Sequence, residues 1–253
     1  MSAKPHIGWG WPLFMAFIRL PLILIGSGIV ILAYRLTGIS VGIAAGVAWA
    51  TLTITVVNAA CLGLLFWRAK LEGVHLSDMI GFQRRQFLRD LGLGILWSML
   101  LYALMLGGIF VALFTIQSIT GPVTFGQIFV GNANTSFQLP QWLAVISAVV
   151  FPILNAPVEE LQYRGYTQPR LIALSGSVWC GILITAAGFG LQHMAFALTL
   201  SAAPIFVVGF FLWGFGAGII AHRQQRLAPL IIAHFMSNLL FGVIPLFFVL
   251  QSG

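Results

Sequence analysis

Long apolar runs with very few charged residues recur along the whole chain. Seven of these runs are close to the length of about 20 residues that an α-helix needs to cross a hydrocarbon core about 30 Å thick. Only 7% of the residues are charged, whereas a soluble domain has about 25%. The runs are approximately Trp11–Tyr34, Val41–Trp67, Leu91–Ile116, Trp142–Leu161, Val178–Phe196, Ile205–Ala221 and Leu230–Leu250.

This pattern predicts an all-α fold, a polytopic membrane helix bundle that forms one integral membrane domain over residues 1–253. The expected number of transmembrane helices is seven, or eight if one of the first two runs is broken at Pro21 or Gly46. The lipid bilayer is thus the first expected partner. The net charge of +7 does not indicate nucleic acid, because the basic residues form no dense basic face.

The distribution of basic residues predicts the orientation of the bundle. With a cytoplasmic N-terminus, ten of the twelve Lys and Arg residues fall on the cytoplasmic side, as the positive-inside rule requires. Arg35 then lies outside, and Arg19 lies inside the first run, where we expect it to snorkel toward the inner surface. The ten cytoplasmic residues are Lys4, Arg68, Lys70, Arg84, Arg85, Arg89, Arg164, Arg170, Arg223 and Arg226.

Two of the five acidic residues, Glu159 and Glu160, are adjacent at the end of an apolar run. An acid inside a span costs about 2.5–3.5 kcal/mol and therefore usually marks a function or a required partner. Arg164 follows Glu160 by four residues, so the two are expected to pair on one helix face. Glu159 points about 100° away and stays available for chemistry. The alternative is that both glutamates mark a helix end, paired with Arg164 and Arg170.

The other three acids lie in a basic loop, where water is expected to solvate them. They are Glu72, Asp78 and Asp90.

Two histidines and an asparagine lie in later runs. His193 is late in the fifth run, and His234 is early in the last one, with Asn238 one turn after it. With a turn near residues 175–177, straight helices place Glu159 and His193 at one depth, about 24 Å from the turn. His234 is only about one turn past the preceding loop, so sharing that depth requires the Glu159–His193 hairpin to project beyond the membrane surface by two turns or more.

These groups suit the hydrolysis of a peptide bond. Glu159 and a neutral His193 around one water molecule would deprotonate it for attack on a carbonyl. His234 and Asn238 would donate to the developing oxyanion. The sequence has no G-x-S-x-G motif and gives neither cysteine a catalytic context. No cofactor is required, although His193, His234 and Glu159 would also make an open zinc site, so zinc catalysis stays open.

Three motifs in this order, Glu159-Glu160-x-x-x-Arg164, Phe189-x-x-x-His193 and His234-x-x-x-Asn238, resemble those of the CPBP family. These are the CAAX-processing and bacteriocin-processing (Abi-type) intramembrane proteases. The resemblance covers a core region from about residue 142 to residue 247. It implies an endopeptidase whose active site opens toward the cytoplasm. By this resemblance Glu159 is the general base with His193, and His234 and Asn238 stabilise the oxyanion. Glu160, Arg164 and Phe189 have supporting roles.

The resemblance also implies a substrate class, a membrane-bound or lipidated protein or peptide. Processing would be of the CAAX type or of the bacteriocin or signal-peptide type, and we expect a bacterial plasma membrane. The glutamate mechanism is favoured over zinc, because a donor role explains Asn238 better than metal ligation does.

Two other classes of function stay open. One is a non-catalytic scaffold or bacteriocin immunity protein with the same fold. The other is a proton-coupled transporter, which would predict inverted repeats that the sequence lacks. The sequence does not predict an oligomeric state.

Overall fold

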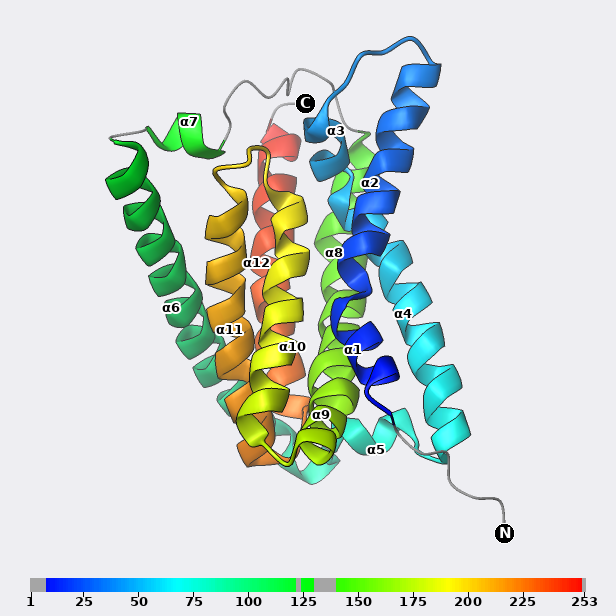
Figure 1. Ribbon diagram of the computed structural model, residues 1–253. Coiled ribbons are helices and arrows are strands. Elements are labelled where there is room, and N and C mark those ends of the chain that lie inside the picture. The colour runs from blue at the N-terminus through cyan, green and yellow to red at the C-terminus, as the bar shows by residue number, and fades with distance from the viewer. Residues whose placement is uncertain (1–7, 122–123, 130–139, 252–253) are drawn as a thin grey trace.

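The computed structural model describes residues 8–121, 124–129 and 140–251, which fold into a helical bundle (Figure 1). No β-strand occurs among them, which confirms the predicted all-α class. In chain order the helices are α1 (Gly10–Phe17), α2 (Arg19–Leu36), α3 (Ile43–Ala48), α4 (Ala50–Glu72), α5 (Leu76–Ile80), the 3₁₀-helix η1 (Arg84–Gln86), α6 (Phe87–Thr120), α7 (Phe125–Phe129), α8 (Gln141–Glu160), the π-helix η2 (Leu161–Thr167), α9 (Gln168–Ser175), α10 (Val178–Gln192), the 3₁₀-helix η3 (His193–Phe196), α11 (Ala203–Gln224) and α12 (Ala228–Gln251).

Five helical segments of the described chain are long and apolar enough to cross a membrane. α8 and α12, with 20 and 24 residues, run beside them in the bundle (Figure 1). Large apolar side chains such as Leu88 and Phe114 are exposed on the outside, as expected for a surface that faces lipid. The exact number of spans and the side of the N-terminus stay predictions. The five segments are Arg19–Leu36, Ala50–Glu72, Leu76–Thr120, Val178–Phe196 and Ala203–Gln224.

Both of the first two apolar runs are broken, close to the predicted points. The first is divided at Ile18, where α1 ends and α2 begins. Pro21 has no N–H to donate to the carbonyl of Phe17, four residues before it, which explains a break directly after Phe17. The second is divided at Trp49, between α3 and α4. α1 and α3 have eight and six residues, too few for a span.

α8 lies at the centre of the bundle, where it packs against α4 and α12. α10 packs against α11, which in turn packs against α6. The predicted turn near residues 175–177 is present, since Gly176 ends α9 in the left-handed conformation and Ser177 caps α10. α1 lies directly on the backbone of α10, because a Cβ added at Gly188 would be 2.0 Å from the carbonyl oxygen of Ala16. This close approach brings the break before α2 into the interior.

Two acids that were expected to be solvated instead join helices at one end of the bundle. Glu72 accepts hydrogen bonds from Arg68 (Nε, 2.9 Å), from Tyr166 (Oη, 2.6 Å) and from Arg170 (Nε, 3.0 Å). A separate ion pair links the fully buried Asp90 to Arg226, at 2.7 Å between Oδ2 and Nη2. The expectation of solvation was wrong for both, because arginines from other helices supply the counter-charge.

Candidate active site

The four residues predicted to be catalytic are all buried, and all line one cavity of about 440 Å³. Glu159 is the penultimate residue of α8, His193 begins η3, and His234 and Asn238 lie one turn apart on α12. Most of the remaining wall is apolar, with Ile23, Ile54, Met105, Phe196, Phe210 and Trp213 among its residues. The cavity therefore combines a few convergent polar groups with an apolar wall, which is typical of a ligand-binding or catalytic pocket.

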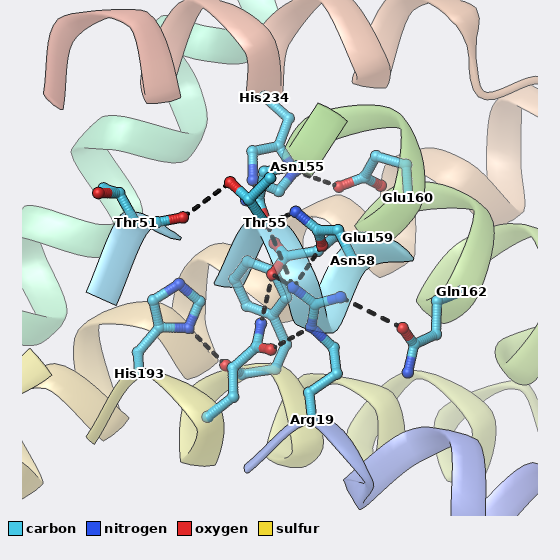
Figure 2. A network of polar contacts seen from close by, with 12 residues as sticks. Arg19, Thr51, Thr55, Asn58, Asn155, Glu159, Glu160, Gln162, His193 and His234 are labelled. Atoms are coloured by element: carbon cyan, nitrogen blue, oxygen red, sulfur yellow. Dashed lines mark hydrogen bonds and ion pairs between the residues drawn. The ribbon is translucent and has the colours of Figure 1, made fainter. Parts of the chain in front are cut away.

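The two carboxylate oxygens of Glu159 have different surroundings (Figure 2). Oε1 accepts hydrogen bonds from Arg19 Nη2 at 2.7 Å and from Gln192 Nε2 at 3.0 Å. Oε2 is buried without a hydrogen-bond partner among the described residues. It lies 3.4 Å from Nε2 of His234. Oε2 is therefore the atom of Glu159 that is free to accept a proton.

His234 lies between the two glutamates. Its Nδ1 is 2.8 Å from Glu160 Oε1 (Figure 2). The same oxygen accepts a hydrogen bond from Arg164 Nη1 at 3.2 Å. Because an ionised carboxylate only accepts, Nδ1 carries a hydrogen and Nε2 is directed toward Glu159. The predicted Glu160–Arg164 pair is thus present, and it also fixes the orientation of His234.

His193 is held in a single tautomer by the backbone. Its Nδ1 is 2.6 Å from the carbonyl oxygen of Phe189, an acceptor, so Nδ1 carries the hydrogen and Nε2 keeps its lone pair. The imidazole stacks on Phe210, with centroids 3.6 Å apart and an interplanar angle of 7°. The Arg164 guanidinium lies over Phe189, 4.6 Å from its centroid. Phe189 thus supports the site by holding His193 and by packing under Arg164.

Asn238 contributes an unused donor to the cavity. Its Nδ2 is buried and has no hydrogen-bond partner within the described part of the chain. Burial of an amide N–H without a partner costs free energy, which usually signals that something else pairs with it. The cavity wall therefore offers one free acceptor, on Glu159, and one free donor, on Asn238.

The expectation that Arg19 snorkels to the surface was wrong, because its side chain is fully buried and paired with Glu159. The ion pair compensates for the burial of both charges. The sequence contained an indication of this ion pair. An ionisable residue within a span requires a partner, and Glu159 was predicted to stay unpaired. The alternative pairing of the glutamates with Arg170 is also wrong, because Arg170 bonds Glu72.

His234 lies at the same depth in the bundle as both glutamates. The number of residues between each group and its nearest turn had made this the least expected contact of the site. That count assumed one straight α-helix from Glu159 to the turn. The chain instead passes through the π-helix η2 before α9 begins. π-Helical segments occur frequently at functional sites.

The zinc alternative requires three side chains that converge on one point. Within residues 8–121, 124–129 and 140–251, no three His, Cys, Asp or Glu side chains are grouped to hold a metal ion. Arg19 occupies Oε1 of Glu159 and Glu160 occupies Nδ1 of His234, which leaves Oε2 and Nε2 as the atoms that face each other. The zinc alternative stays a prediction.

Comparison with known protein families finds a match to part of the chain. Residues 140–240 match the family described as Rce1-like, type II CAAX prenyl endopeptidase Rce1-like. No curated protein and no solved structure matches the chain. The matched stretch contains all three motifs, from Glu159 to Asn238. The part of the chain that carries the candidate active site is thus similar to the Rce1-like type II CAAX prenyl endopeptidases.

Proposed function

We propose that the protein is an intramembrane endopeptidase in which Glu159 and His193 activate a water molecule for attack on a peptide bond. The observation that carries the proposal is the pair of unsatisfied groups in one buried cavity. Glu159 Oε2 is an acceptor without a donor, and Asn238 Nδ2 is a donor without an acceptor. A water molecule and a substrate carbonyl would satisfy both.

The first step is general-base catalysis. Glu159 Oε2 takes one proton from the water, and Nε2 of His193 accepts a hydrogen bond from its other hydrogen. The water oxygen forms a bond to the carbonyl carbon, and the carbonyl oxygen becomes an oxyanion. Asn238 Nδ2–H donates to that oxyanion, as does His234 Nε2 when the imidazole carries both hydrogens. Glu160, on the other nitrogen of His234, supports that charged form.

The second step breaks the carbon–nitrogen bond. Glu159 returns its proton to the leaving nitrogen, which departs as an amine, and the carbonyl carbon becomes a carboxylic acid. All atoms of the water are then in the products and Glu159 is again a carboxylate. No step requires a metal, and the unpaired donor of Asn238 has a role in this mechanism. We therefore favour the glutamate mechanism.

The proposed substrate is a membrane-associated or lipidated protein or peptide. The apolar wall of the cavity would hold apolar groups of the substrate close to the reacting bond. CAAX-type processing follows most directly from the matched family, and bacteriocin or signal-peptide processing is the other form. The proposal places the protein in a bacterial plasma membrane, with the site open to the cytoplasm.

The test is cleavage of an internally quenched peptide that ends in a farnesylated C-a-a-X sequence. Full-length protein in proteoliposomes is assayed with and without a chelator, as wild type, Glu159→Gln and His193→Ala. Asp78→Asn is the control, since Asp78 is an exposed acid on α5. We expect Glu159→Gln to lose at least about 10³-fold in kcat. We expect the control and the chelated enzyme to keep the wild-type rate.

Wild-type cleavage by Glu159→Gln would show that Glu159 is not the base. Loss of activity with the chelator, restored by zinc, would favour the metal mechanism. A wild-type protein that cleaves neither lipidated nor unmodified membrane peptides would favour the scaffold or immunity function.

A further inference from the structure

One residue of the candidate site lies far outside the stretch that matches the protease family. Arg19 is in the first turn of α2, more than 100 residues before residue 140. Its side chain is fully buried, and α2 buries only one other residue, Ile23. The interruption of the first apolar run at Ile18 and the contact of α1 with Gly188 carry Arg19 into the bundle.

The guanidinium of Arg19 donates hydrogen bonds to side chains from four helices, α4, α8, η2 and α10 (Figure 2). Because guanidinium is only a donor, each neighbouring amide turns its oxygen toward it. The charged partner is Glu159, and no other carboxylate is within ion-pair distance of Arg19 among the described residues. The acceptors are Gln192 Oε1 (2.6 Å), Gln162 Oε1 (3.4 Å), Asn58 Oδ1 (2.8 Å), Asn155 Oδ1 (3.2 Å) and Glu159 Oε1 (2.7 Å).

This arrangement determines which oxygen of Glu159 reacts. Arg19 and Gln192 both donate to Oε1, so the carboxylate plane is fixed and Oε2 is left toward the cavity. Arg19 bonds Oε1 of Glu159 and Oε1 of Gln192 at once, so it also orients the second donor. A planar fork that bonds several acceptors is a property of arginine that lysine lacks.

We propose that Arg19 is a positioning residue of the protease, which keeps Glu159 ionised and directs its free oxygen at the water molecule. This inference rests on the proposed function. Arg19 acts through Glu159 and does not reach the substrate, because acceptors of the protein already occupy all three of its nitrogens. The active site is then built from two separate parts of the chain, the matched region and the first turn of α2.

The experiment compares Arg19→Lys and Arg19→Met with Arg35→Met, using the farnesylated quenched peptide in proteoliposomes. Arg35 is an exposed arginine at the other end of the same helix, so its variant controls for loss of charge on α2. Rates are normalised to folded protein, and kcat and KM are measured from pH 4 to pH 9. The ionisable groups around Glu159 that enter this profile are Arg19, His193, His234, Arg164, Cys61, Tyr163 and Glu160.

Arg19→Lys keeps the positive charge but loses the planar guanidinium group that bonds several acceptors at once. We therefore expect kcat to fall about tenfold or more, with KM changed by less than about threefold and the acidic limb of the profile in place. Arg19→Met also loses the charge, so the inactive protonated carboxyl persists to higher pH. The acidic limb should move up by about one pH unit or more. Arg35→Met should match the wild type.

A wild-type kcat in Arg19→Lys together with a wild-type profile in Arg19→Met would overturn the inference. If Arg19→Met does not fold, Arg19→Lys decides alone, since reduced kcat per folded molecule supports positioning and an unchanged kcat contradicts it. Failure of the proposed function gives a different result from failure of this inference. If the proposed function is wrong, Glu159→Gln stays active. If only the role of Arg19 is wrong, Glu159→Gln is inactive and the Arg19 variants behave as wild type.

Discussion

His234 is bonded to Glu160 through Nδ1, at 2.8 Å, and faces Glu159 through Nε2, at 3.4 Å. The two adjacent glutamates therefore contact opposite sides of one imidazole. Arg164 pairs with Glu160 and Arg19 pairs with Glu159, so each carboxylate also has its own cation. The two residues of the Glu-Glu motif thus have distinct structural positions, one facing the cavity and the other behind His234.

Glu160→Gln should reduce activity without removing the base. The amide keeps the shape of the side chain. It lacks the negative charge of the carboxylate, which supports the doubly protonated form of His234. We expect kcat/KM to fall by roughly 10²-fold, in the range seen when one oxyanion donor is lost. The measurement is the steady-state rate beside Glu159→Gln, which should be lower still. Equal rates for Glu160→Gln and wild type would contradict the role given to Glu160.

Arg164→Met should mainly lower the stability of the fold. Arg164 is buried, bonds Glu160 and donates to the carbonyl of Gly214 at 3.2 Å. Removing one partner of a buried ion pair costs about 3–5 kcal/mol, because the other charge stays buried alone. The loss is measured by chemical unfolding in detergent. Arg84→Met, at an exposed arginine of η1, is the control and should unfold as the wild type does.

Gly188→Ala should displace α1 and with it Arg19. The added Cβ would lie 2.0 Å from the Ala16 carbonyl oxygen, a backbone atom that cannot move without its helix. We expect loss of stability together with lower kcat. Gly107→Ala in α6 is the matched control, since its Cβ meets nothing within 4 Å. It should stabilise the protein by about 0.5–1 kcal/mol, the helix propensity difference. Opposite signs for the two variants, measured by thermal unfolding, are the expected result.

Glu72→Gln should lower stability and leave catalysis unchanged. Its carboxylate joins α4 to η2 and α9 through Tyr166 and Arg170, at the end of the bundle and outside the cavity wall. Hydrogen bonds to a charged group contribute about 1.5–3 kcal/mol each, and the amide retains part of them. A lower unfolding midpoint with an unchanged kcat at 25 °C is the expected outcome. A change in kcat would instead couple this end of the bundle to the active site.

The sequence predicted those features that depend on local spacing. The Glu160–Arg164 pair follows from the helix repeat, and His234 and Asn238 lie one turn apart on α12 for the same reason. The bundle itself follows from the apolar runs. The three motifs also lie within residues 140–240, the stretch that matches the family.

The features that the sequence did not predict depend on contacts between distant residues. Arg19 and Glu159 are 140 positions apart, and no helical period relates them. In the sequence, Asn58 and Gln192 are single polar residues within apolar helices. Only the folded bundle brings their side-chain oxygens to Arg19. The residue pattern alone does not place His234 against both glutamates, because the π-helix η2 that follows Glu160 is not apparent from it.

The unpaired donor of the cavity has a consequence for the conformation in which a substrate would be cut. Inside an intact α-helix each peptide carbonyl already accepts a hydrogen bond from the N–H four residues further on. The Asn238 donor, which has no partner in the described part of the chain, needs a carbonyl that is free to accept. Under the proposed function the scissile bond would therefore arrive on an unwound stretch, which a free chain end supplies most easily.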